Sequence, residues 1–277
     1  MPRLMLLSLI LFSLTLPSST FAADLFPDKN LETAIKKTLK KGEKEELKED
    51  DLKNVFILHA TKAGIKDLSG IEKCFNLAEL KLSDNEISDL APLKDLKNCQ
   101  SLYLSNNKIA DITPLAGWEK LQHIELENNQ VKSLKAFEKL TKLASAYLSQ
   151  NQIESLEPLS GLVKLSSLDV SHNKIKDITP LKGITRIMSL NLKNNEMTDV
   201  SPLSAMTDLR YTQLQNNQIT DLKPLVEMAK KDAAGPKNFA PYWNLYLAGN
   251  PLSDEAKTKQ IEELKKLGVR VNLELKN

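Results

Sequence analysis

Three acidic side chains are the residues whose types and spacing come nearest to catalytic chemistry. Glu125 and Glu127 are two positions apart and share one face of an extended segment, and Asp169 follows Glu125 by 44 residues. Paired carboxylates separated by roughly 6 to 10 Å act as acid, base or nucleophile in glycoside hydrolases. That chemistry needs a pocket that excludes water and shifts the pKa of one of the carboxyl groups. The repeat described below predicts a gently curved open sheet, which does not provide such a pocket. We therefore predict surface acids and a protein that is not an enzyme.

Metal and cofactor chemistry have weaker support in the sequence. The three histidines, His59, His123 and His172, belong to different copies of the 22-residue repeat described below. They are at least two copies apart, which is too far to share one metal ion. No phosphate-binding loop or nucleophile motif is present in the sequence. We predict no cofactor.

A strict repeat supplies the elements that position these residues. Leu77, Leu80, Leu82 and Asn85 match the leucine-rich-repeat pattern L-x-x-L-x-L-x-x-N. The x-L-x-L stretch alternates inward and outward as a short strand, and stacked coils align these strands into a parallel sheet. A buried asparagine amide can then hydrogen-bond backbone groups within and between coils. The predicted asparagine ladder is Asn85, Asn107, Asn129, Asn151, Asn173, Asn195, Asn217 and Asn250.

The repeat divides the chain into regions. Leucine-rich repeats are predicted over 55–252, with coils starting at 55, 77, 99, 121, 143, 165, 187, 209 and 242. The last step is 33 residues rather than 22, so an insertion within 228–241 is predicted to form a projecting loop or a short helix. One coil cannot bury enough apolar surface alone, so the coils must stack and the ends must be covered. We predict a helical amino-terminal cap over 23–54, begun by Asp28, and a helix–strand carboxy-terminal cap over 253–277.

The first residues indicate export. Residues 1–22 combine Arg3, an apolar run and small residues before a predicted cut between Ala22 and Ala23, as in a secretory signal peptide. The apolar run is too short to span a bilayer, so no stable membrane insertion is expected after cleavage; a retained interfacial anchor is the alternative. The protein is predicted to be periplasmic or secreted.

A formal charge of only +2 argues against a nucleic-acid partner.

The two cysteines stand where the pattern has core leucines. Cys74 and Cys99 fall on neighbouring coils near the same turn, in a compartment that is expected to be oxidising. A disulfide between them is one interpretation. Two small buried thiols that fill leucine sites are the other.

The region from about Phe26 to Asn250 resembles the internalin-type bacterial leucine-rich repeats. The resemblance rests on the 22-residue period, the phrase Asp111-Ile-Thr-Pro-Leu115 and the cap that begins near Phe26, Pro27 and Asp28. It implies an α/β horseshoe solenoid with a concave parallel sheet and short 3₁₀ turns on the convex side. It also implies a concave face that binds host proteins or other macromolecules.

Strand alternation predicts which side chains a partner would meet. The third, fifth and seventh residues of each coil point outward, and tyrosine, with an apolar ring and a polar tip, is an effective binding anchor. The first predicted patch is Tyr103, His123, Glu125 and Tyr147, with Asp169 further along the same column; the second is Tyr211, Trp243 and Tyr246. The alternative is that these rings only pack along a neutral sheet.

The function predicted from this surface is binding by a monomeric protein. A protein partner, from a host or from the cell envelope, is the first expectation. Glycan or cell-wall binding by the same face is the alternative, because tyrosine and tryptophan also stack on sugar rings.

Overall fold

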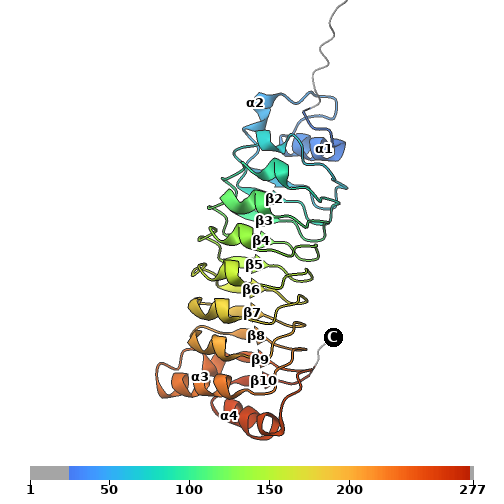
Figure 1. Cartoon of the computed structure of the whole chain (residues 1–277). Helices are drawn as coiled ribbons and strands as arrows, with labels where there is room; N and C mark the ends of the chain where they lie inside the picture. Colours follow the sequence, from blue (N-terminus) through green and yellow to red (C-terminus); the bar gives the residue numbers. More distant parts are fainter. Residues whose placement is uncertain (1–24, 275–277) are drawn as a thin grey trace, which may run out of the picture.

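The computed structural model describes residues 25–274, so the predicted signal peptide, residues 1–22, lies outside the described residues. The described chain is a leucine-rich-repeat solenoid with one parallel sheet, whose strands are stacked in sequence order (Figure 1). Each strand is three residues long, because the coil turns away from the sheet at both ends. The strands are β1 (Ile57–His59), β2 (Glu79–Lys81), β3 (Ser101–Tyr103), β4 (His123–Glu125), β5 (Ser145–Tyr147), β6 (Ser167–Asp169), β7 (Ser189–Asn191), β8 (Tyr211–Gln213), β9 (Asn244–Tyr246) and β10 (Arg270–Asn272).

The 22-residue period of the sequence determines the register of the sheet. Leu58 lies opposite Leu80, and each later pair up to β8 joins residues that are 22 apart. The insertion changes the next step, so that Thr212 on β8 lies opposite Leu245 on β9. The middle residue of each strand from β1 to β9 is buried, while its two neighbours remain at least partly exposed. Stacked in this way, the inward side chains form one continuous core.

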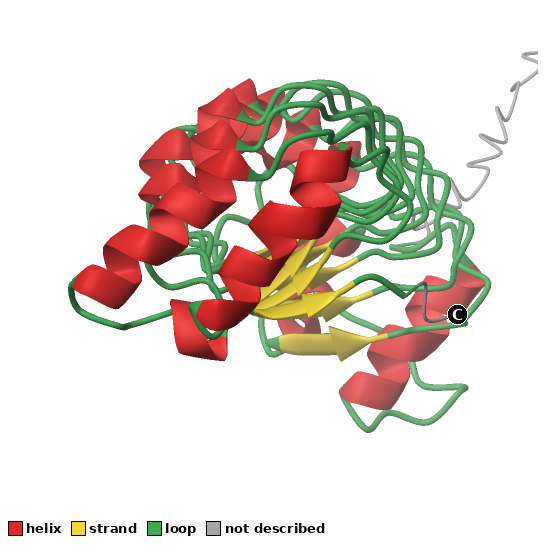
Figure 2. Cartoon of the chain, turned by 90° about the horizontal axis from the view of Figure 1, so that it is seen from below, coloured by secondary structure: helices red, strands yellow, loops and turns green. Residues whose placement is uncertain are grey.

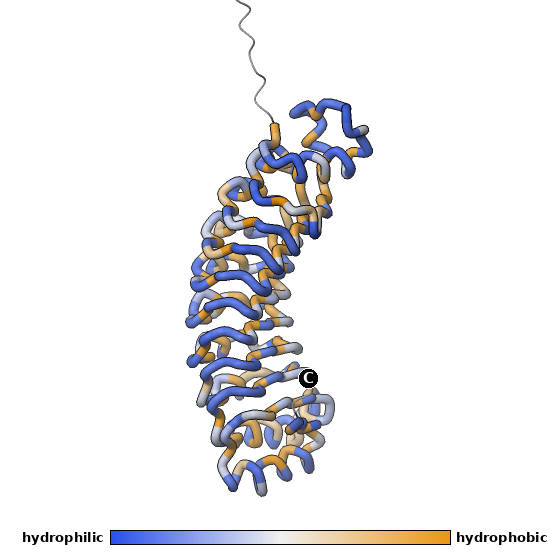
Figure 3. Tube along the Cα trace, turned by 90° about the vertical axis from the view of Figure 1, so that its right-hand side faces the viewer, coloured by the Kyte–Doolittle hydropathy of each residue, from blue (hydrophilic) through white to orange (hydrophobic). Residues whose placement is uncertain are grey.

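Short 3₁₀ turns lie on the side of the coils opposite the sheet (Figure 2). The stack of coils is curved along its length (Figure 3). Asp111 begins one such turn by accepting a hydrogen bond from the backbone N of Thr113 at 2.8 Å. Ser133 does the same for Lys135 at 3.3 Å, where the pattern lacks aspartate. These turns are η1 (Ile71–Lys73), η2 (Ala91–Leu93), η3 (Thr113–Gly117), η4 (Lys135–Phe137), η5 (Glu157–Leu159), η6 (Thr179–Gly183) and η7 (Ser201–Ala205).

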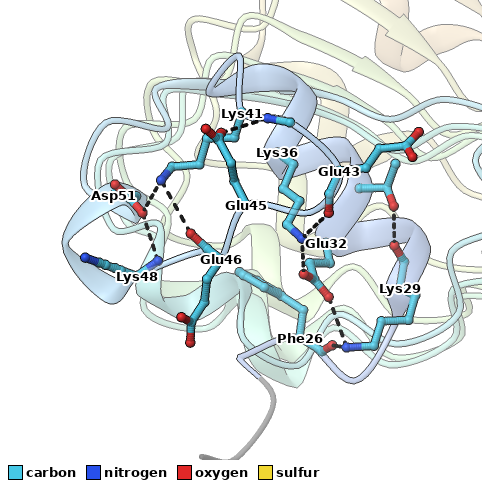
Figure 4. Close-up of polar contacts among 12 residues, drawn as sticks. Phe26, Lys29, Glu32, Lys36, Lys41, Glu43, Glu45, Glu46, Lys48 and Asp51 are labelled. Atoms are coloured by element: carbon cyan, nitrogen blue, oxygen red, sulfur yellow. Dashed lines mark hydrogen bonds and ion pairs between the residues drawn. The ribbon is translucent and has the colours of Figure 1, made fainter.

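The amino-terminal cap is built from helices α1 (Lys29–Thr38) and α2 (Glu49–Leu52). Asp28 caps α1, since one carboxylate oxygen accepts from the backbone N of Asn30 and Leu31 at 2.9 and 3.2 Å. Ion pairs of the cap, including Lys41 with Asp51 at 2.9 Å, hold the loop between the two helices (Figure 4). Leu31 and Ile35 are fully buried, so the inner face of α1 joins the core and covers the first coil.

The insertion replaces a 3₁₀ turn with a longer helix, α3 (Lys223–Ala234), followed by the short turn η8 (Ala240–Tyr242). The buried carboxylate of Asp232 accepts from the backbone N of Asn238, Phe239 and Ala240 at 2.8, 3.3 and 2.9 Å, which closes the loop after the helix. Seen from below, α3 extends beyond the side of the stack that the 3₁₀ turns form (Figure 2).

The carboxy-terminal cap begins with the π-helical turn η9 (Ala256–Gln260), continues as α4 (Ile261–Lys266) and ends with β10. Gln260 joins this cap to α3, because its Oε1 accepts from the backbone N of Leu222 at 2.7 Å and its Nε2 donates to Asp221 at 2.5 Å. Within residues 25–274, none of the helices combines the length and apolarity needed to cross a bilayer.

Both cysteines are free thiols in the core, so the structure does not form the disulfide that their spacing allowed. Cys74 and Cys99 are each fully buried at the leucine positions of their coils. Burial raises the pKa of each thiol to about 12, which leaves them protonated and unreactive. They act as small apolar side chains.

Candidate partner-binding surface

The asparagine ladder fixes the end of each strand and so positions the side chains on the sheet. Asn129 is typical: its Oδ1 accepts from the backbone N of Ile109 at 3.0 Å, in the preceding coil. Its Nδ2 donates to the carbonyl oxygens of Leu104 and Leu126 at 3.0 and 3.1 Å. The same contacts recur at Asn85, Asn107, Asn151, Asn173, Asn195, Asn217 and Asn250.

An aromatic row crosses the sheet from β3 to β5. The ring centroid of His123 lies 4.9 Å from that of Tyr103 and 5.6 Å from that of Tyr147, with tilted planes. All three rings are partly exposed on the outer face of the sheet. The structure thus brings together the first predicted patch.

Carboxylates border this row. Glu125 lies on the rung between the two tyrosines and contacts His123, with 3.1 Å between Oε1 and Nε2. Glu127 accepts a hydrogen bond from the Ser105 hydroxyl. Burial raises the pKa of Glu127 above its ordinary value; the hydrogen bond from Ser105 offsets part of this rise, and the charges of Glu125 and Asp169 add to it. The centre of the surface is therefore acidic, with one carboxyl that ionises reluctantly.

Asp169 faces the other side of the same acidic region, but its carboxylate is engaged locally. Its Oδ2 accepts from Nδ2 of Asn191 at 2.8 Å, and its Oδ1 accepts from the hydroxyl of Ser171 at 2.7 Å. This network holds the carboxylate in one orientation on the sheet.

A charged pair at the amino-terminal end of the row was not singled out from the sequence. The Lys81 ammonium lies 4.7 Å from the centre of the Tyr103 ring and 3.1 Å from Oε1 of Glu79. Nε2 of His59 lies 2.6 Å from the same Glu79 oxygen. The hydrogen bond with His59 lowers the pKa of Glu79, and Lys81 adds to this effect. Glu79 is the third residue of its coil, and Lys81 and His59 are each the fifth residue of theirs. These outward-facing positions in the sequence could have identified the group.

The second predicted patch loses one member. Trp243 is fully buried, and its indole N–H donates to the hydroxyl of Thr212 at 2.8 Å. Thr212 is the middle residue of β8, where most other strands carry leucine or isoleucine, and its hydroxyl gives the indole a buried hydrogen-bond partner. The prediction of Trp243 as a contact residue is therefore wrong. Tyr211 is 52% exposed and Tyr246 is partly exposed, so both remain on the surface.

A second ladder lies beside the buried one, at the rim of the sheet, and was not foreseen. The residue before each ladder asparagine has a left-handed backbone: Asn106, Asn128 and Asn194, for example, have φ of 59°, 52° and 53°. Asparagine tolerates this conformation better than most residues. Side-chain amides link successive coils, as in the bond of Asn128 Nδ2 to Asn106 Oδ1 at 2.9 Å. The repeated Asn-Asn pair was the sequence signal.

Among the described residues, no group of three histidine, cysteine, aspartate or glutamate side chains is arranged to hold a metal ion. The arrangement on the sheet is a broad, shallow surface of tyrosine, histidine and carboxylate groups. Such a surface suits recognition of another molecule through stacking, hydrogen bonds and charge.

Comparison with known proteins agrees with this architecture. The family model for leucine-rich repeats (two copies) matches residues 75–117, 97–140 and 141–183. A search of curated proteins gives no significant match. Solved structures of two Listeria monocytogenes proteins are similar. The internalin inlF is 28% identical with a TM-score of 0.78, covering 90% of this chain and 76% of its own. Internalin C2 is 33% identical with a TM-score of 0.71, covering 74% and 91%.

The fold also extends to more distant proteins. The plant peptide hormone receptor RGFR1 is 22% identical with a TM-score of 0.54, covering 66% of this chain and 33% of its own, which shows the shared fold alone. The internalin similarity is closer and spans almost all of internalin C2. On this evidence, the chain belongs to the internalin-type leucine-rich-repeat proteins.

Proposed function

We propose that this chain is an exported, monomeric binding protein that takes a protein partner on its concave sheet, centred on Tyr103, His123, Glu125 and Tyr147. The observation that carries the proposal is the aromatic row. Its rings point away from the core and remain partly exposed, so packing of the solenoid does not account for them. Rigid aromatic side chains of this kind dominate the energetics of protein interfaces.

The charges around the row favour a partner with a polar, mainly basic contact surface. Glu125, Glu127 and Asp169 give the centre its negative charge, and Lys81 places a cation at the amino-terminal end of the row. Tyr211 and Tyr246 offer a second anchor towards the carboxy-terminal end. The partner belongs to the cell envelope or to a host.

The relatives support a non-enzymatic binding role. Internalin-type repeats are binding scaffolds rather than catalytic domains. RGFR1, which shares the fold, was solved in complex with RGF2, so a related solenoid accommodates a polypeptide ligand. This supports a protein partner rather than a small substrate.

Export follows from residues 1–22 acting as a signal peptide. The expected product begins at Ala23 and resides in the periplasm or outside the cell. Intact-mass measurement of the protein from the periplasm and culture medium tests this. A full-length mass in the cytoplasm, with none exported, would contradict it.

The concave-face proposal is tested with the double variant Tyr103→Ala/Tyr147→Ala. The immobilised protein is exposed to envelope and host-cell extracts, and retained proteins are identified by mass spectrometry. The double variant should lose the specifically retained protein while keeping its thermal stability, because both rings lie on the surface. Phe75→Ala, which removes an aromatic side chain 53% exposed away from the sheet, is the matched control and should retain the partner.

Retention by the folded double variant would remove the aromatic row from the binding surface. A glycan array and a peptidoglycan pull-down with the same variants test the alternative ligand class. Tyrosine-dependent binding to glycan, without any retained protein, would replace the protein-binding proposal.

A further inference from the structure

A row of basic side chains runs along a flank of the solenoid, beside the strands and outside the concave surface described above. Lys142, Lys164 and Arg186 hold one place in successive coils, immediately before the residue that opens the next coil, and all three are exposed. Stacked strands place neighbours in such a column about 4.8 Å apart. We call these three residues the flank row.

The flank row borders a hollow of about 600 Å³ that also has an apolar lining. Val163 and Met188 line it and are 58% and 48% exposed, although apolar side chains of this size usually lie in the core. Asp208 is the one carboxylate in the lining, and its Oδ2 lies 3.9 Å from Nε of Arg186. The hollow therefore combines a positive edge with an exposed apolar floor.

The surface continues towards the loop that follows α3. Arg210 lies next to Met188 in the adjacent coil, with its backbone N bonded to the Met188 carbonyl at 2.8 Å. Its guanidinium lies 5.4 Å from the centre of the Tyr242 ring and donates to the carbonyl of Asn238 at 2.9 Å. Tyr242 is 56% exposed. A fixed cation–aromatic pair thus ends the flank surface.

Among the described residues, Arg186 is the one member of the flank row with an acidic neighbour, Asp208. In the part of the chain that the structure describes, no carboxylate lies within 4.0 Å of the ammonium of Lys142 or Lys164. We propose that the flank binds an extended acidic segment of a partner protein, with apolar side chains between its carboxylates. Carboxylates pair with the flank row, while the apolar side chains cover Val163 and Met188. Cation clusters recognise acidic motifs in this manner.

Other polyanions would pair with the basic side chains of this surface but would not cover its apolar side chains. A sulfated glycan or a phosphate polymer provides charge but leaves the apolar floor in water. An anionic membrane favours cations spread across a face or along an amphipathic helix, whereas these form a single row beside a hollow. The surface spans the rungs from β5 to β9, about 20 Å, which an extended segment of about six residues covers.

The probe is a fluorescein-labelled peptide of about ten residues, in which aspartate and glutamate alternate with leucine. Fluorescence anisotropy measures its binding to the full chain. Two further peptides replace the leucines by serine or the acids by lysine. The first peptide should bind most tightly, the serine peptide more weakly and the lysine peptide not at all. Added salt should weaken binding, because exposed charges are screened.

The variant Lys142→Gln/Lys164→Gln/Arg186→Gln should weaken binding of the acidic leucine peptide by about tenfold or more, since three exposed charge contacts are lost. Met188→Ser should lower affinity for this peptide but not for its serine analogue. The matched control Lys94→Gln/Lys132→Gln/Lys174→Gln removes the same charge from exposed sites elsewhere and should bind normally. The Tyr103→Ala/Tyr147→Ala variant should also bind normally, which separates the flank from the concave surface.

Equal losses in the two triple variants would show non-specific attraction and overturn the proposal. An unchanged affinity in the folded flank variant would also overturn it. Preferential, flank-dependent binding of phosphatidylglycerol vesicles or of heparin over the acidic leucine peptide would assign the surface to another class of partner.

Discussion

Each ladder asparagine links two coils through a single short side chain. Its oxygen accepts from a backbone N–H of the preceding coil, and its amide group donates to carbonyl oxygens of both coils. An amide offers both functions, whereas an aspartate lacks the donor and a leucine lacks both. This chemistry explains why asparagine returns at the same place in every coil from the second to the last.

Asn129→Leu should lower the free energy of unfolding by about 2 to 3 kcal/mol, because it leaves the buried backbone N–H of Ile109 without a partner. It also removes one of the two side-chain donors to each of the carbonyl oxygens of Leu104 and Leu126. Urea unfolding followed by circular dichroism measures the change. Gln130→Leu is a control at the adjacent exposed position and should have little effect. Equal stability of the Asn129 variant and the wild type would contradict the role of the ladder.

Glu127 should make stability depend on pH. Burial raises its pKa in the folded state, so its contribution is most favourable below the unfolded pKa and is lost as pH rises through the folded pKa. Glu127→Gln cannot ionise and can still accept from Ser105. It should raise the melting temperature at about pH 7 and give no gain below about pH 4, where the unfolded carboxyl is also protonated.

Melting curves of both proteins across this range test the expectation. The exposed Glu119→Gln provides a control and should not reproduce the gain at neutral pH. A gain for Glu127→Gln that is the same at both ends of the range would exclude ionisation as its cause.

At the scale of elements, a polar side chain in each cap is hydrogen-bonded to the neighbouring part of the solenoid. Asp28 both starts α1 and joins it to the first coil, because its second carboxylate oxygen accepts from the backbone N of Lys66 and Asp67 at 2.8 and 3.2 Å. Gln260 has the corresponding role between α3 and α4. A polar side chain thus fixes each cap against the repeats, while its apolar face covers the core.

Asp28→Ala should destabilise the protein by about 1 to 2 kcal/mol at neutral pH through loss of the helix cap. Burial disfavours the charge of Asp28, but the four backbone N–H groups together outweigh it and lower its pKa. Its stabilisation is therefore present above the unfolded pKa and lost as pH falls through the folded pKa. The difference between variant and wild type should shrink below about pH 4.

Thermal unfolding at several pH values measures this difference. Asp28→Asn retains a capping oxygen and should cost less than alanine. An alanine penalty that does not change with pH would show that the charge of Asp28 contributes nothing.

At the scale of the whole molecule, stability is shared between neighbouring coils. Each coil contacts the one before and the one after, and the pairing of every strand from β1 to β8 repeats the same register. In such a stack, the free energy of folding is approximately a sum of coil and interface contributions. Internal coils are therefore interchangeable in their backbone, although their surface side chains differ.

Deletion of residues 143–164, one complete coil, should give a folded but less stable protein with β4 paired to β6. Deletion of residues 25–54 should instead cause aggregation, because it exposes Val55, Leu58 and the first edge of the sheet. Circular dichroism and small-angle scattering distinguish a shorter solenoid from an unfolded chain. Loss of folded structure in the coil deletion would contradict the additive description.

The sequence by itself determined the repeat, the strand register and the buried asparagines, because a period of 22 places the same residue types at the same point of every turn. The caps were also predictable, since Asp28 is a good helix-capping residue before α1 and Gly268, which has a φ of 93°, follows the end of α4. The shared outward face of Tyr103, His123 and Tyr147 was predictable because side chains alternate along a strand.

Only the tertiary structure decided the features that depend on contacts between coils. Trp243 is buried, with its indole N–H bonded to the hydroxyl of Thr212 in another coil. The inserted segment forms α3 because its apolar face packs on the core and Asp232 closes the following loop. Cys74 and Cys99 remain thiols because each fills its own site in the core. Periodicity specifies which side of the chain a residue occupies, but the volume and direction of neighbouring side chains decide what it touches.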